Sequence, residues 1–291
     1  MQYQIKLNQK KINPNINISV INYRSDYTKK KPNVYNQFFP YIQSNIFLLE
    51  PYSYLKDINN KSISYFIIIE IINKYNIKNP SMMFSNSLIY ITSLNEMFQN
   101  IDLITQNKLC SYKKYIIHDY NGFIDNYKKR HATIIIHYDN YKTFLINIFI
   151  ALIIQNNKGT LIFNIPTTGS DFFLNIIYFL MSYYTITMVK PFATVMHSNE
   201  RYVICKNYNK DTTPTFLKYI KKNIDIINTL KHPYLHVNKP YYYLKLIEEE
   251  DTIWQTYILN ILSKILINND IKYTNEQNKI IIKRWYCENI R

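Results

Sequence analysis

The distribution of hydrophobic and polar positions is most regular between residues 159 and 208, where it predicts a strand, a helix and a pair of strands in succession. Residues 160–165 form a short run rich in apolar and β-branched side chains, which is typical of a buried strand. In residues 171–184 apolar side chains recur every three or four positions, which predicts a helix with one buried face. Residues 185–189 and 202–205 predict two further strands joined by a polar segment.

The N-terminal half continues the alternation of helices and strands. Residues 63–75 predict a helix, and Pro80 prevents it from continuing. Residues 87–91 are predicted to be the first strand of the sheet. Two later short strands and a long helix are expected at 114–117, 133–138 and 141–155.

Strands that alternate with helices indicate an α/β fold with a Rossmann-like, doubly wound sheet and helices on both faces. Residues 61–208 are expected to form this domain. Residues 1–60 combine a polar, basic, asparagine-rich start with an aromatic-rich stretch, so we expect an N-terminal arm and loops. Residues 209–291 begin with an amphipathic basic helix at 215–230, which predicts a helical C-terminal extension.

The composition is that of a basic chain that can bury a core. Hydrophobic residues make up 47% of the 291 residues, and the formal net charge is +15. This charge favours a polyanionic partner such as RNA, or an acidic protein, whereas a solvated basic surface produced by AT-biased codon usage explains it equally well. No apolar run approaches the ~20 residues that a bilayer span needs, so no membrane association is expected.

The cysteines and histidines exclude two common kinds of site. Three cysteines, far apart in the sequence, are too few for a disulfide framework or a zinc site. The six histidines show none of the spacings that metal-binding motifs require. We therefore expect no metal.

Glycine is scarce, since only Gly122, Gly159 and Gly169 are present. A cofactor turn after the first strand of a doubly wound sheet needs glycine, because the backbone must approach the ligand closely and adopt positive φ. The residues that follow the expected strand at 87–91 include none. The sequence therefore predicts no bound cofactor.

The last two predicted strands carry an ordered set of residues, Lys190-Pro191 followed by Ser198, Glu200 and Tyr202. This order resembles the C-terminal half of the FtsJ-like RNA 2′-O-methyltransferases. The resemblance implies a methyltransferase sheet, trimmed in its middle because the chain leaves little length there. It also implies a family whose cofactor is S-adenosylmethionine and whose Lys-Asp-Lys-Glu catalytic set would take its glutamate from Glu200.

Compared with that family, the catalytic set of this chain is broken. Asn164 stands where the lysine of the glycine-led strand is expected, and Ile67 takes the place of the first lysine. A neutral amide cannot activate a ribose hydroxyl as an ammonium would. The aspartate has two candidates: Asp119 has the more family-like distance to Gly159, whereas Asp139 precedes the long helix and suits its N-cap. The candidate remnants of a catalytic site are Asp119, Asn164 and Glu200.

Three strand segments also resemble the small, non-catalytic subunit of the poxvirus mRNA-capping enzyme. They are residues 136–142 (IHYDNYK), 161–166 (LIFNIP) and 203–208 (VICKNY). The resemblance implies a heterodimer in which this chain binds a large capping-enzyme subunit and activates its guanine-N7 methyltransferase domain. It further implies contact with the viral transcription machinery and a location in the host cytoplasm and the virion.

These resemblances lead to two expected functions. The preferred one is a regulatory subunit without cofactor or intrinsic activity, and the alternative is an active S-adenosylmethionine-dependent cap 2′-O-methyltransferase. A purely structural or nucleic-acid-binding role stays open as a third. The basic side chains expected at the end of the sheet, as candidates for contact with RNA phosphate, are Lys190, His197, Arg201 and Lys206.

Overall fold

The computed structural model describes most of the chain from residue 61 onward and short segments before it. The described residues are 3–7, 19–22, 55, 61–78, 80–98, 101–105, 114–115, 120–127, 129–194, 198–209, 214–268, 280 and 283–289. From α3 (Ile63–Lys74) to β9 (Arg201–Lys206) helices and strands alternate, as the sequence predicts.

The first strand of the sheet lies earlier than the sequence suggests. It is β3 (Met82–Phe84), and residues 87–91 instead open helix α4 (Leu88–Met97). The side chain of Ser87 accepts a hydrogen bond from Tyr90 N (3.5 Å) and so caps this helix. The predicted strand is wrong because the apolar run after Ser87 continues to the buried Leu94 at helical spacing.

The main sheet has eight strands in the order β1-β8-β9-β7-β6-β3-β4-β5. Strands β5, β4, β3, β6 and β7 run parallel to one another, whereas β9 is antiparallel to both β7 and β8. Strand β1 pairs antiparallel with β8 and so joins part of the expected N-terminal arm to the sheet. The remaining bounds are β1 Tyr3–Leu7, β4 Asp102–Ile104, β5 Lys114–Tyr115, β6 His131–Ile136, β7 Gln155–Ile165 and β8 Thr185–Lys190.

The strand order identifies the switch point of the sheet. From β3 the chain moves outward through β4 to β5, and from β6 it moves in the other direction through β7 to β8 and β9. This reversal between β3 and β6 is the mark of a doubly wound sheet. The fold is therefore the doubly wound, Rossmann-like sheet that the sequence predicts. The short strands β4 and β5, with three and two residues, form one end of the sheet and not its middle.

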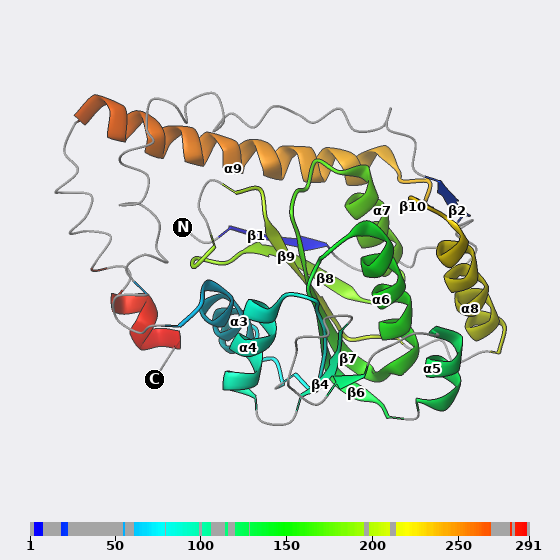
Figure 1. The fold of residues 1–291 in the computed structure, drawn as a ribbon. Helices are drawn as coiled ribbons and strands as arrows, with labels where there is room; N and C mark the ends of the chain where they lie inside the picture. Colours follow the sequence, from blue (N-terminus) through cyan, green and yellow to red (C-terminus); the bar gives the residue numbers. More distant parts are fainter. Residues whose placement is uncertain are drawn as a thin grey trace.

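Helices cover both faces of the sheet (Figure 1). Leu161 and Phe163 of β7 face the core under α6 and α7, while Ile162 between them faces the core under α3 and α4. A strand buried on both faces reads as a continuous apolar run, which is why residues 160–165 show no alternation. The helices on the first face are α5 Tyr120–Asn126, α6 Tyr141–Ile154, α7 Asp171–Leu180 and α8 Pro214–Thr229.

Gly159 allows β7 to approach β6 closely. A Cβ atom at this position would lie 2.7 Å from Gln155 Cγ and 2.9 Å from the Ala132 carbonyl oxygen. Because the second atom belongs to the backbone, a larger residue would push the two central strands apart.

The C-terminal extension is helical, as expected, and contains one additional strand. Helix α8 confirms the amphipathic helix predicted at 215–230. After it, β10 (Pro233–His236) pairs with β2 (Ser19–Asn22), and α9 (Tyr241–Asn268) then runs past one edge of the sheet (Figure 1). Within the described residues, no helix is long and apolar enough to cross a bilayer.

Candidate functional site

The carboxyl ends of the parallel strands form the edge of the sheet where doubly wound folds bind ligands. Asp139 follows β6 at this edge, Asn164 lies near the end of β7, and Glu200 directly precedes the antiparallel β9. Asn164 Nδ2 donates to Glu200 Oε1 (3.0 Å), and Asn164 Oδ1 accepts from Tyr138 N (2.8 Å). The structure thus brings together Asn164 and Glu200, which the sequence selects.

Asn164 acts as a neutral bridge between three strands. It is 8% exposed, and its amide uses both a donor and an acceptor. A lysine in its place could not accept the Tyr138 N–H. Ile67, at the other expected lysine position, is buried in the core between α3 and the sheet. Neither position supplies the positive charge on which the FtsJ-like set depends.

Asp139 does not cap the long helix, which corrects the sequence prediction. Asn140 is the N-cap of α6, and its side chain accepts from Thr143 N (2.9 Å). Asp139 Oδ2 instead accepts from Asn86 N (3.0 Å), and its Oδ1 lies 3.2 Å from His137 Nδ1. The carboxylate therefore ties the end of β6 to the turn after β3. Asp119, the other candidate, lies outside the described residues.

Two buried tyrosines enclose Glu200. Burial, and then the charge of Glu200, raise the pKa of Tyr202 and of Tyr90 well above the ordinary range. Tyr202 also hydrogen-bonds to Glu200, and the Tyr90 ring packs 4.4 Å from the His137 ring. Both phenols consequently stay protonated at neutral pH and can act only as donors or packing groups.

A small polar cavity lies at the switch point, between the ends of β3, β4 and β6. Its volume is about 10 Å³, which is room for roughly one water molecule. The turn after β3 closes on itself, because Ser87 N donates to Ser85 Oγ (3.1 Å) and Thr105 Oγ1 donates to Asn86 Oδ1 (3.3 Å). S-adenosylmethionine does not fit this arrangement of side chains. The polar residues around the cavity are Ser85, Asn86, Thr105, Tyr120, Asp139, Thr143 and Asn147.

The expected phosphate-binding side chains do not form one group. Lys190 and Arg201 lie together at the carboxyl edge, but each is only 4% exposed. Their charges lie 5.5 and 5.0 Å from the centre of the Trp254 ring, which α9 places over them. Lys190 Nζ also donates to the carbonyl (2.7 Å) and hydroxyl (3.1 Å) of Ser198. Helix α9 thus covers the part of the edge that the sequence assigns to RNA.

Lys206 lies at the opposite end of β9 from Arg201. Its ammonium donates to the carbonyl of Tyr75 at the C-terminus of α3, where the helix dipole favours a positive charge. Burial lowers the pKa of this lysine. The contact corrects its expected place at the mouth of the sheet, since Lys206 caps a helix instead. His197 lies outside the described residues.

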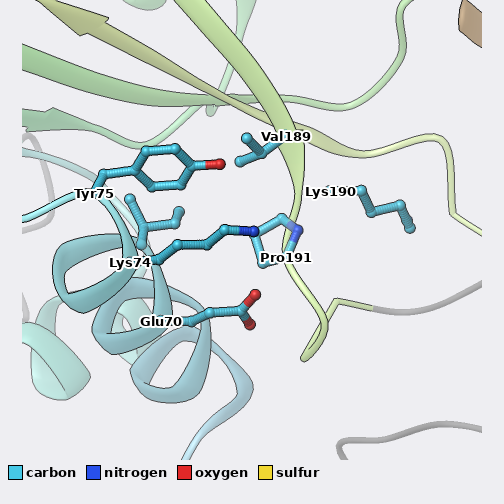
Figure 2. Close-up of a pocket in the computed structure, with 7 residues that line it drawn as sticks. Glu70, Lys74, Tyr75, Val189, Lys190 and Pro191 are labelled. Atoms are coloured by element: carbon cyan, nitrogen blue, oxygen red, sulfur yellow. The ribbon is translucent and has the colours of Figure 1, made fainter. Parts of the chain in front are cut away.

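A buried carboxylate that the sequence analysis missed joins α3 to the loop after β8. Glu70 is 2% exposed and accepts hydrogen bonds from Phe192 N (2.9 and 3.0 Å) and Ala193 N (3.4 Å). Figure 2 shows Glu70, Lys74 and Tyr75 beside Pro191, with the side chain of Lys190 directed away from them. The signal was the single charge inside an apolar helix face, FIIIEII.

The surroundings of Glu70 leave only a cavity of about 10 Å³. Burial, and then the Glu70 charge, raise the pKa of Tyr75 to about 12. The Glu70 carboxylate therefore connects α3 to the loop after β8 and is a structural group rather than a reactive centre. Among the described residues, no three His, Cys, Asp or Glu side chains gather as a metal site would require.

Comparison with known proteins gives similarity in structure only. No protein-family model matches the sequence, and no curated protein does. Among solved structures, an rRNA methylase from Streptococcus thermophilus aligns with 50% of this chain and 94% of its own at 12% identity and a TM-score of 0.35. The N-methyltransferase NodS from Bradyrhizobium japonicum, solved with S-adenosyl-L-homocysteine, aligns with 60% of this chain and 99% of its own at 10% identity and a TM-score of 0.35.

A third similar structure is titled alphavirus P23pro-zbd. It aligns with 58% of this chain at 14% identity and a TM-score of 0.35, and this chain covers 27% of its length. Several neighbours are methylases or methyltransferases by title, and the similarity is weak in every case. The fold assignment rests on the strand order and not on these scores.

Proposed function

We propose that this chain is a methyltransferase-like regulatory subunit without catalysis of its own, which binds the large subunit of a viral mRNA-capping enzyme and activates its guanine-N7 methyltransferase domain. The observation that carries the proposal is the neutral Asn164, held by hydrogen bonds at the position where a catalytic ammonium is expected. Its partner Glu200 is retained, but it is engaged by Asn164 and by Tyr202.

The closed switch point supports the same conclusion. In this fold a cofactor would enter between β3 and β6, where the protein's own Asn86 and Asp139 are bonded to each other. Opening this contact would break the hydrogen bond between the Asn86 N–H and the Asp139 carboxylate, at a cost of about 1–3 kcal/mol before any ligand binds. The turn after β3 contains no glycine, so its backbone cannot approach a cofactor more closely to offset this cost.

The assignment to a capping enzyme rests on the sequence resemblance at 136–142, 161–166 and 203–208. Segments 161–166 and 203–208 lie mostly in β7 and β9, and segment 136–142 runs from the last residue of β6 into the start of α6. Strands β6, β7 and β9 are neighbours in the middle of the sheet, so retention of these segments fits a fold kept as a scaffold. The proposal includes a heterodimer, a location in the host cytoplasm and the virion, and participation in viral transcription.

Two measurements test the proposal. Calorimetric titration of S-adenosylmethionine into the purified chain is expected to give no heat. Co-expression with the large capping subunit from the same source is expected to yield a stable complex, with guanine-N7 methylation of capped RNA at least about tenfold faster than by the large subunit alone. Micromolar binding of S-adenosylmethionine, or no complex, would contradict it.

One observation favours the alternative, an active cap 2′-O-methyltransferase. Asp139 and Glu200 both remain at the carboxyl edge, close to the point between β3 and β6 where doubly wound folds bind their ligands. If the titration shows binding, ribose methylation of capped RNA is the assay to run, with Glu200→Ala as the inactive control. Activity abolished by that substitution would establish the alternative.

A further inference from the structure

The amino edge of the sheet, where the parallel strands begin, lies opposite the candidate site and carries several exposed, positively charged side chains. Lys78 precedes β3, Lys129 and Arg130 precede β6, and Lys158 lies near the start of β7, where the pairing with β6 shifts register. All four residues are exposed. Because these loops connect to the amino ends of adjacent strands, their charges lie along one side of the molecule.

Helix α8 extends this basic surface. The Phe216 ring near its start lies 5.5 Å from the ring of Tyr183, which precedes β8 at the same edge. Asn209 N also donates to Tyr183 O (2.8 Å), which holds the chain leading to α8 against the amino edge. The first turns of α8 then present Lys218 and Lys222 to solvent. We call the six residues Lys78, Lys129, Arg130, Lys158, Lys218 and Lys222 the amino-edge surface.

Carboxylates among the described residues here are few and engaged. Asp102 is bonded to Lys129 (2.8 Å), and Asp125 of α5 is bonded to Lys221 of α8. Asp225 lies one turn beyond Lys222 on α8. Positive charge is therefore in excess along this edge. The carboxyl edge differs, because Asp139, Glu200 and Asp251 lie there with its cations.

The loops of this edge also share an unusual backbone conformation. The non-glycine residues with positive φ among those described are Asn76 (48°), Lys158 (60°) and Asn207 (58°), which lie before β3, near the start of β7 and after β9. Asparagine tolerates this region, but lysine has no such tendency, and the left-handed form costs it about 1–2 kcal/mol. Lys158 stands with the exposed Asn156 and Asn157 in the part of β7 where the pairing with β6 shifts register.

We propose that the amino-edge surface binds the phosphate backbone of RNA, and that RNA consequently meets this protein on the side away from its degenerate active site. Lysine and arginine supply the attraction to phosphate, and the exposed amides of Asn76, Asn157 and Asn207 can donate to phosphate and sugar oxygens. Exposed cations and neutral amides together fit the phosphate and sugar groups of a nucleic-acid backbone.

The test compares two triple variants with the same change in charge. Lys78→Gln, Lys158→Gln and Lys222→Gln remove three members of the amino-edge surface. Lys231→Gln, Lys245→Gln and Lys283→Gln remove three exposed lysines that lie elsewhere. Binding of a fluorescein-labelled oligouridylate about 20 nucleotides long is followed by anisotropy at several salt concentrations, and thermal unfolding verifies that each variant folds.

The first triple is expected to weaken binding by at least about tenfold at 0.1 M salt. It should also lower the slope of log K against log salt by about 2, since each phosphate contact with a single strand contributes roughly 0.7. The control triple should change affinity by less than about threefold. Equal losses in both variants, or no salt-dependent binding by the wild type, would overturn the proposal. Loss of a co-purifying protein without RNA binding would overturn it in favour of an acidic protein partner.

Discussion

At the scale of single residues, Asn164 decides how the candidate site can be understood. It occupies a position next to Glu200 where the FtsJ-like resemblance calls for a charge, and it satisfies two groups that a lysine could not satisfy together. The site is therefore more than an active site with one residue removed. Its remaining groups are hydrogen-bonded within the protein, Glu200 to Asn164 and Asp139 to Asn86.

This arrangement predicts a pH-dependent effect of Asn164→Asp. The substitution removes the donor to Glu200 and sets two carboxylates against each other, which raises the pKa of the pair. We expect a loss of about 1–3 kcal/mol in the free energy of unfolding at pH 7. This loss of stability should become smaller as the pH is lowered from 7 toward about 4. Protonation of one of the two carboxyls then restores a hydrogen-bond donor between them. Urea denaturation at several pH values measures the change in the free energy of unfolding.

The control for this substitution is Asn156→Asp at an exposed position near the start of β7. It introduces the same charge where solvent screens it, so its effect should stay within about 0.5 kcal/mol. A pH-independent loss in Asn164→Asp would show that the amide acts through packing alone, without coupling to Glu200.

Sequence reasoning at this scale selects residues of strands more readily than it identifies contacts made by turns. The sequence selects both Asn164 and Glu200, and the structure brings them together because Asn164 lies in β7 and Glu200 directly precedes the adjacent β9. Asp139 was assigned to the helix cap because it precedes the helix, but Asn140 is one residue closer. Its true partner, Asn86, is 53 residues away, and no local pattern reveals a contact of that kind.

At the scale of elements, the prediction failed where an apolar run was too short to show its period. Leu88 to Ile91 fits a strand as well as a helix, and only the serine cap and Leu94 distinguish them. Helix α9 shows the opposite difficulty: the acidic run at 248–251 divides its pattern, yet the helix continues through it. Lys190 and Arg201 are buried because Trp254 of α9 packs over them. The sequence around these two residues contains no sign of that contact.

Helix α9 is expected to depend on Trp254 for its attachment to the sheet. This residue is 7% exposed and contacts both Lys190 and Arg201. Trp254→Ala should lower the free energy of unfolding by about 3–5 kcal/mol through lost burial, including about 0.5–2 kcal/mol from the cation–π contacts. Limited proteolysis should then cut α9 much faster than in the wild type.

The neighbouring Ile253, which is 54% exposed, provides a matched control. Ile253→Ala lies on the outer side of the same helix turn and should change stability by less than about 0.5 kcal/mol. Trp254→Phe keeps an aromatic face over the two cations, so its loss of stability should lie between those of Trp254→Ala and Ile253→Ala. If Trp254→Ala behaves like the control, α9 is held by its other contacts, such as the hydrogen bond of Asp251 with Thr168 (2.6 Å).

At the scale of the whole molecule, the two edges of the sheet differ in their charge and in what covers them. The carboxyl edge, where such folds bind ligands, is closed by side chains and crossed by α9 (Figure 1). The amino edge is open, basic and poor in free carboxylates. Net charge alone could not separate these edges, because the lysines are spread along the entire chain and only the topology sorts them.

This division predicts how RNA length affects the proposed complex with the large capping subunit. The amino-edge triple Lys78→Gln, Lys158→Gln and Lys222→Gln should raise the KM of guanine-N7 methylation for long capped RNA several-fold more than for a capped dinucleotide. A short substrate gains little from a phosphate-binding surface remote from the reacting base, whereas a long one gains a contact for each phosphate it places there.

The comparison needs the control triple Lys231→Gln, Lys245→Gln and Lys283→Gln in the same complex, with KM measured at two salt concentrations. A length-dependent effect that weakens at high salt and appears only in the first triple would place the RNA path along the amino edge. An equal rise in KM for both substrates would mean that these lysines contact the large subunit, since a fault in assembly affects every substrate alike. The length of the RNA thus distinguishes a nucleic-acid surface from a subunit interface on the same residues.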